Sequence, residues 1–140
     1  MLIKIKEDTY LNIKNVAYMD IDEKDFSYTT MGNKELSYVN FDFISRDELI
    51  ALFEGDNAKQ FLGLSGDQVK IYINVETIVK VDYLKEDDGV KVHVWFINDD
   101  NSYTFRIRYD EHDDRDFIDR FIKEINTRLG EIKPQYVDHF

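Results

Sequence analysis

The densest cluster of side chains that could do chemistry lies between residues 110 and 116. It reads Asp110-Glu-His-Asp-Asp114, and Asp116 follows two positions later. Carboxylates and an imidazole can bind a divalent cation. The spacing does not match a calcium-binding loop, which needs a central glycine and a closing glutamate at its twelfth position. Acidic residues are also favoured at the start of a helix by capping and by the helix dipole, so the sequence favours a helix start over a metal site.

The other candidates for catalysis are scattered along the chain. His93, His112 and His139 are far apart, and no nucleophile site of serine or cysteine accompanies them. Among 29 acidic residues some carboxylates must lie close by chance, and only a buried pair would have the shifted pKa that catalysis uses. No glycine-rich phosphate loop precedes a helix. The sequence therefore predicts no catalytic residue, no metal and no cofactor, and it does not indicate an enzyme.

Charge and composition point toward a protein partner. The chain has 140 residues, of which 43% are hydrophobic, which is enough for the core of one domain. Its net charge of −11 disfavours duplex nucleic acid and anionic membranes as direct partners and favours a protein with a basic surface. The absence of cysteine excludes disulfides, and no apolar run approaches the ~18 residues of a membrane span. We expect a cytoplasmic protein without a signal peptide.

Two segments of the chain resemble each other at an offset of 62 residues. Residues 10–20 align with residues 72–82, and Tyr10, Asn12 and Asp20 recur as Tyr72, Asn74 and Asp82. Further on, residues 38–43 resemble residues 102–107. Repeats of this kind indicate duplicated structural units. The sequence predicts an α+β fold with two tandem copies, residues 1–64 and 65–130, packed as one pseudo-symmetric domain and followed by a tail, residues 131–140.

Each copy is predicted to hold a four-stranded antiparallel sheet followed by a C-terminal helix. A capping box at Ser45 and Glu48 begins the first helix, Gly55 ends it, and a short further turn reaches residue 62. The second helix spans about 113 to 129 and ends at Gly130, with its apolar residues on one stripe. The predicted strands are 2–6, 16–22, 26–30 and 36–43 in the first copy and 69–75, 78–85, 90–97 and 103–109 in the second. The stripe consists of Phe117, Ile118, Phe121, Ile122, Ile125 and Leu129.

Two surfaces are candidates for binding. The first is an acidic end, where the predicted hairpin turn Asp87-Asp88-Gly89 and the loop before the second helix should meet. The second is an aromatic face, because residues in strand 90–97 alternate between Val92, Val94 and Phe96 on one side and His93 and Trp95 on the other. The alternative is that the two copies pack these faces together, which would place Trp95 in the core. The acidic end consists of Asp87, Asp88, Asp110, Glu111, Asp113 and Asp114. The aromatic face consists of Tyr18, Tyr38, His93 and Trp95.

These features favour a small, acidic, non-catalytic protein-binding protein. An acidic surface that docks on a basic site would suit an inhibitor or nucleic-acid mimic of the kind that phages and mobile elements encode. The alternative is a sensor that holds a small ligand or nucleotide signal between the repeats or between subunits. A homodimer is compatible with either function.

Overall fold

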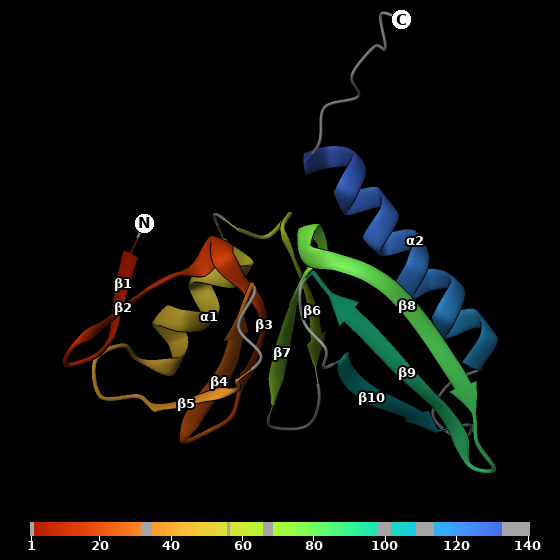
Figure 1. Ribbon diagram of the computed structural model, residues 1–140, viewed down its shortest axis with the longest axis horizontal. Coiled ribbons are helices and arrows are strands. Elements are labelled where there is room, and N and C mark those ends of the chain that lie inside the picture. Colours follow the sequence, from red (N-terminus) through yellow and green to blue (C-terminus); the bar gives the residue numbers. More distant parts are fainter. Residues whose placement is uncertain are drawn as a thin grey trace, which may run out of the picture.

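The computed structural model describes residues 2–31, 35–55, 57–65, 69–97, 102–108 and 114–132. Within these ranges, ten strands form three antiparallel sheets and two α-helices pack against them (Figure 1). The predicted mixed α+β class is therefore confirmed. Most of the predicted tail, residues 133–140, lies outside the described residues.

The largest sheet has the strand order β5-β4-β3-β7-β6. A hairpin of β1 (Leu2–Lys6) and β2 (Thr9–Asn12) precedes it, and a 3₁₀ turn, η1 (Ile13–Asn15), leads from β2 into β3. Three of its strands form a meander, and the hairpin of the other two joins it through antiparallel pairing of β7 with β3. Its strands are β3 (Val16–Ile21), β4 (Asp25–Thr30), β5 (Ser37–Asn40), β6 (Phe61–Ser65) and β7 (Lys70–Asn74).

The third sheet has the order β10-β9-β8 and follows a second 3₁₀ turn, η2 (Val75–Thr77). The backbone N–H of Glu86 donates to the carbonyl of Gly89 at 2.8 Å and closes the hairpin between β8 and β9. The Asp-Asp-Gly turn predicted there is confirmed. The strands of this sheet are β8 (Ile78–Lys85), β9 (Gly89–Phe96) and β10 (Ser102–Arg108).

Local signals define both helices well. The first, α1 (Arg46–Glu54), begins with the predicted capping box, in which the side chains of Ser45 and Glu48 each accept from the other's backbone N–H, and Gly55 caps its end. The second, α2 (Asp114–Ile132), buries its apolar stripe as predicted. The prediction that Gly130 ends this helix is wrong. The glycine is exposed, and one glycine inside a helix costs only about 1 kcal/mol relative to alanine.

The two helices cover opposite faces of the sheet that β3, β6 and β7 share. Phe53 of α1 packs on one face with Phe61 and Tyr72, whereas Phe121 of α2 packs on the other face with Ile73. The hairpin β6–β7 is therefore buried on both sides, as its central place in Figure 1 suggests. A further turn does follow Gly55, and in it the backbone N–H of Phe61 donates to the carbonyl of Asn57 at 3.2 Å. The prediction that this turn reaches residue 62 is wrong, because β6 begins at Phe61.

The prediction of a four-stranded sheet in each half is also wrong. The strands divide into sheets of two, five and three, because β3 pairs with β7 across the chain and the hairpin β1–β2 stays separate. The same order of elements nevertheless occurs twice. Two strands, a 3₁₀ turn, three strands and an α-helix run from β1 to α1, and the same series runs from β6 to α2.

Candidate functional site

One face of the sheet β8–β9–β10 is covered by α2, and on the other the described side chains are exposed or half-buried. Along β9, Val92, Val94 and Phe96 are buried, and Phe96 and Val94 pack with the core of α2. The alternating residues His93 and Trp95 are half-buried on the opposite face. Cross-strand partners share a face, so pairing extends this surface onto the neighbouring strands. We call it the outer face, and its residues are Lys80, Asp82, Leu84, Lys91, His93, Trp95, Thr104 and Arg106.

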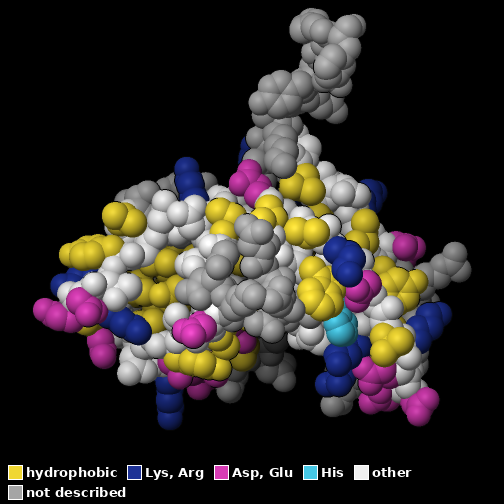
Figure 2. Space-filling view, viewed as in Figure 1, with side chains coloured by type: hydrophobic (Ala, Val, Ile, Leu, Met, Phe, Trp, Pro, Cys, Tyr) yellow, Lys and Arg dark blue, Asp and Glu magenta, His cyan; other side chains and the backbone are white. Residues whose placement is uncertain are grey.

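The outer face mixes charge with apolar surface. Leu84 is exposed there, and Lys80, Asp82 and Arg106 are exposed around the half-buried aromatic rings. Figure 2 shows hydrophobic, basic and acidic side chains close together over the region of β8 and β9. An apolar patch within a polar rim is the usual composition of a protein-docking surface.

Trp95 is held in place by its neighbours on β8. Its indole nitrogen Nε1 donates a hydrogen bond of 3.1 Å to Oδ2 of Asp82. Lys80 Nζ lies 5.0 Å from the centre of the ring and 3.7 Å from the same carboxylate oxygen. The ring of His93 lies 6.2 Å away. A cation over an indole contributes about 0.5–1 kcal/mol at an exposed site, so these contacts favour one orientation of the ring before any partner binds.

The acidic turn between β8 and β9 lies at one end of the outer face. Asp87 and Asp88 are exposed, and Glu86 forms an ion pair of 3.4 Å with Arg106. Asp110, Glu111 and Asp113 lie outside the described residues, and Asp114 begins α2 with its side chain outside the description.

The four residues of the predicted aromatic face occupy three places. His93 and Trp95 lie together on the outer face. Tyr18 of β3 is instead half-buried against the second half, with its ring centre 5.5 Å from that of Phe96 and 5.0 Å from that of Tyr103. Tyr38 is exposed on β5, in a different sheet. The sequence left two arrangements open for these side chains. Tyr18 shows packing between the halves, and Trp95 shows the outward orientation.

A hollow, which the sequence does not predict, lies where α1, β6–β7 and α2 meet. It has a volume of about 320 Å³, and its polar lining includes Glu54, Lys70, Tyr72 and Arg128. Tyr72 donates a hydrogen bond of 2.6 Å to Glu54, and Lys70 Nζ lies 3.0 Å from the same carboxylate oxygen. The bond from Tyr72 lowers the pKa of Glu54, and burial together with Glu54 raises the pKa of Tyr72.

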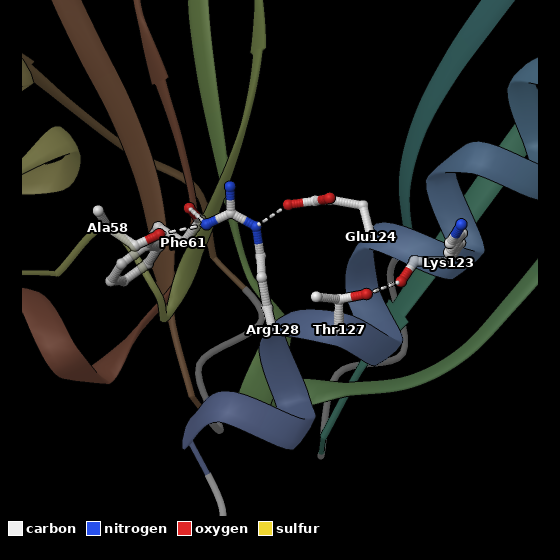
Figure 3. A network of polar contacts seen from close by, with 6 residues as sticks. All are labelled: Ala58, Phe61, Lys123, Glu124, Thr127 and Arg128. Carbon is white, nitrogen blue, oxygen red and sulfur yellow. Dashed lines mark hydrogen bonds and ion pairs between the residues drawn. The ribbon is translucent and has the colours of Figure 1, made fainter.

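Arg128 closes this hollow on the side of α2. Its guanidinium donates to the carbonyl oxygens of Ala58 and Phe61, the latter at 3.0 Å, and pairs with Glu124 at 2.8 Å (Figure 3). These bonds tie α2 to the segment before β6. No local pattern in the sequence signals them, because the partners are 67 and 70 residues apart.

Among the described residues, no three His, Asp or Glu side chains lie close enough to share a metal ion. Neither helix in the described ranges is long and apolar enough to cross a membrane. In the comparisons with known proteins, no family model, no curated protein and no solved structure matches the chain.

Proposed function

We propose that this chain is a non-catalytic protein-binding protein and that the outer face of β8–β9–β10 is its docking surface. The observation that carries the proposal is Trp95, held by Asp82 and Lys80 on an open sheet face beside the exposed Leu84. Tryptophan is enriched among the residues that dominate binding energy at protein interfaces. A ring that is already ordered loses little conformational entropy on binding.

The charge of the chain suggests the partner. A net charge of −11 and the exposed Asp87 and Asp88 would attract a protein with a basic surface and speed its approach. If that basic surface normally contacts nucleic acid, the chain would act as a competitive inhibitor or nucleic-acid mimic. Lys80, Lys91 and Arg106 lie on the outer face itself, so the acidic contribution would come from the turn at its end.

The same proposal includes an origin by tandem duplication. Asn12 and Asn74 cap the two 3₁₀ turns in the same way, each accepting from the backbone N–H two residues ahead. The pairing of β3 with β4 shifts register between Val16 and Tyr18, and that of β8 with β9 shifts at the corresponding positions, between Ile78 and Lys80. In this alignment the hairpin β6–β7 belongs to the second copy, so the boundary would lie before Phe61. An experimental structure whose two halves do not superpose would rule out the duplication.

The docking proposal can be tested with the fluorescence of Trp95, the sole tryptophan of the chain. Partners captured from host extract by the wild type should be purified and titrated against it. Partner binding should shift the emission of Trp95, and Trp95→Ala should weaken affinity at least tenfold by a label-free binding measurement. Asp87→Asn with Asp88→Asn should slow association and reduce its salt dependence. Tyr38→Ala, an exposed aromatic residue on another sheet, is the control. Equal binding by wild type and Trp95→Ala would rule out the outer face.

The hollow beside Glu54 favours a second candidate, a small-ligand sensor. It lies between the two halves, and it combines aromatic walls with two cations and a carboxylate. The charged groups of the hollow, however, already have partners within the protein. Lys70 pairs with Glu54, and Arg128 donates to backbone carbonyls. A panel of nucleotides and small metabolites should raise the melting temperature of the wild type if the hollow binds one of them. Lys70→Met should then remove that shift, and a ligand whose shift survives would bind elsewhere.

A further inference from the structure

Strands β8 and β2 each combine an unpaired edge with exposed apolar side chains. Within the described residues, β8 pairs only with β9, and β2 pairs only with β1. Val79 and Tyr83 of β8 are 65% and 52% exposed, and Tyr10 of β2 is 59% exposed. An unpaired edge presents free N–H and C=O groups to any strand that can approach it, and apolar side chains along that edge add to the attraction.

The protein contains a paired version of the same two strands. In the large sheet, β3 and β7 pair antiparallel, with Tyr18 opposite Ile73 and Asp20 opposite Ile71. In addition, the side-chain nitrogen of Asn74 donates to the carbonyl of Val16 at 2.8 Å. This pairing joins the first series of elements to the second.

By their order in the two series, β8 corresponds to β3 and β2 corresponds to β7. Four side chains that are buried at or beside the β3–β7 junction have exposed counterparts. Tyr72 is 3% exposed and its counterpart Tyr10 is 59% exposed. The other pairs, each given as buried residue and exposed counterpart, are Ala17 (1%) and Val79 (65%), Ile21 (0%) and Tyr83 (52%), and Phe61 (2%) and Leu2 (64%).

The other open edges do not show this asymmetry. In the described residues β5 and β10 correspond to each other, and each has an unpaired outer edge. The same holds for β1 and β6. Among the described strands, only β8 and β2 lack a strand neighbour that their counterparts possess, so these two edges are the ones left incomplete.

Asn12 adds a specific polar group to this comparison. Its side-chain oxygen accepts from the N–H of Lys14 at 3.2 Å, just as that of Asn74 accepts from Glu76 at 3.1 Å. The amide nitrogen of Asn74 also donates to the carbonyl of Val16 in β3. Among the described residues, no acceptor contacts the amide nitrogen of Asn12.

We propose that the chain assembles head to tail, with β8 of one copy pairing antiparallel with β2 of a second copy. The junction would repeat that of β3 with β7, so that Lys80 lies opposite Leu11, Val81 opposite Tyr10, and the amide of Asn12 reaches the carbonyl of Ile78. Such an interface joins two different surfaces and propagates into a ring or an open chain. It uses the edges of the strands and not Trp95, so it is independent of docking at the outer face.

Sedimentation velocity over a range of concentrations tests this assembly. The wild type should form species heavier than a monomer as concentration rises. Two variants each block one surface: Val79→Lys with Tyr83→Lys on β8, and Tyr10→Lys on β2. All mutated side chains are exposed, so both should fold, and circular dichroism checks this. Each variant alone should be monomeric. Mixed in equal amounts they should form a dimer, because the intact β8 of one can pair with the intact β2 of the other.

Three results would overturn the proposal. The first is a wild type that stays monomeric at every concentration. The second is assembly that Tyr10→Lys leaves unchanged while the β8 variant abolishes it, which would indicate two copies pairing through β8 alone. The third is a mixture of the two variants that does not restore a dimer. Tyr38→Lys, which places the same charge on the exposed face of β5, is the control and should assemble like the wild type.

Discussion

The hydroxyl of Tyr72 in β7 donates a 2.6 Å hydrogen bond to the carboxylate of Glu54, the last residue of α1. The Tyr72 ring also stacks on Phe53 one residue earlier, with ring centres 4.7 Å apart and planes 9° from parallel. One side chain therefore gives the hairpin β6–β7 both an apolar and a polar contact with α1. These contacts fix the helix against the strand that joins the two series of elements.

Tyr72→Phe should separate the polar contact from the apolar one. The variant keeps the stacked ring but loses a hydrogen bond to a charged acceptor, and it should lower the free energy of unfolding by about 1 kcal/mol at pH 7, since the carboxylate is half-exposed. The pKa of Glu54 is lowered in the folded protein. The ionised carboxylate therefore contributes fully to the free energy of unfolding above its ordinary pKa of 4.5, and this contribution is lost as the pH falls through the folded pKa.

Urea unfolding of both proteins at pH 7 and at pH 3 measures this effect. The difference in unfolding free energy should be larger at pH 7. An equal difference at both values would show that the ionised carboxylate does not matter to the contact. Tyr38→Phe, whose ring is exposed, serves as the control and should change stability by less than about 0.5 kcal/mol.

Asp20→Asn should stabilise the protein at neutral pH. Burial raises the pKa of Asp20, and Asp22 and Asp25 raise it further. The folded state therefore binds the proton more tightly than the unfolded chain, and stability falls as the pH rises from the ordinary pKa of 3.8 through the folded pKa. The half-buried side chain limits the gain to less than about 1 kcal/mol. Thermal unfolding at pH 7 and at pH 3 should show the gain at pH 7 only, and a destabilised variant at pH 7 would contradict the assignment.

Arg128→Met should loosen the connection between α2 and the segment before β6. It leaves the carbonyls of Ala58 and Phe61 without this donor, which should cost about 2 kcal/mol. Arg128→Lys should recover less than half of the loss, because an ammonium cannot reproduce the guanidinium fork. Arg120→Met, on the exposed side of α2, is the control. Urea unfolding measures all three, and hydrogen exchange should show faster opening near Phe61 in the methionine variant. Full rescue by lysine would mean that charge alone is needed.

Features encoded by neighbouring residues could be predicted from the sequence. The capping box at Ser45, the turn before Gly89 and the stripe of α2 each depend on residues a few positions apart, and each is found as predicted. The outward position of Trp95 follows from alternation along one strand. Gly130 shows the limit of such signals, because a glycine that can end a helix does not have to.

The division into sheets depends on pairing that no local pattern encodes. Met19 and Tyr72 lie opposite each other across β3 and β7, far apart in the chain, and this pairing moves β7 from the sheet predicted for the second half into the five-stranded sheet of β3. In β6, Phe61 packs in the cluster of α1 and Leu62 in the cluster of α2. Residues 61–64 are therefore apolar or small on both faces of the strand and show no alternation. The contact of Tyr18 with Phe96 likewise has no local signal in the sequence, because Phe96 belongs to another sheet.

Phe121→Ala tests whether the two halves share one core. Phe121 is buried in α2, with its ring centre 5.6 Å from that of Phe105, and its cluster includes Ala17 of β3 and Ile73 of β7. Removing the ring should cost about 3–5 kcal/mol, because the transfer energy of the side chain is lost and a cavity remains. A loss below about 1 kcal/mol would show that α2 contributes little to the core.

The way in which this variant unfolds is equally informative. Trp95 fluorescence reports the sheet β8–β9–β10, whereas far-ultraviolet circular dichroism reports the whole chain. Because the cluster around Phe121 contains residues of both large sheets, the two signals should still change together, at a lower denaturant concentration than in the wild type. Asp119→Ala, on the exposed side of the same helix, should shift neither signal measurably. If fluorescence changes before circular dichroism in Phe121→Ala, the halves have separate cores, and the β3–β7 junction alone does not make them one cooperative unit.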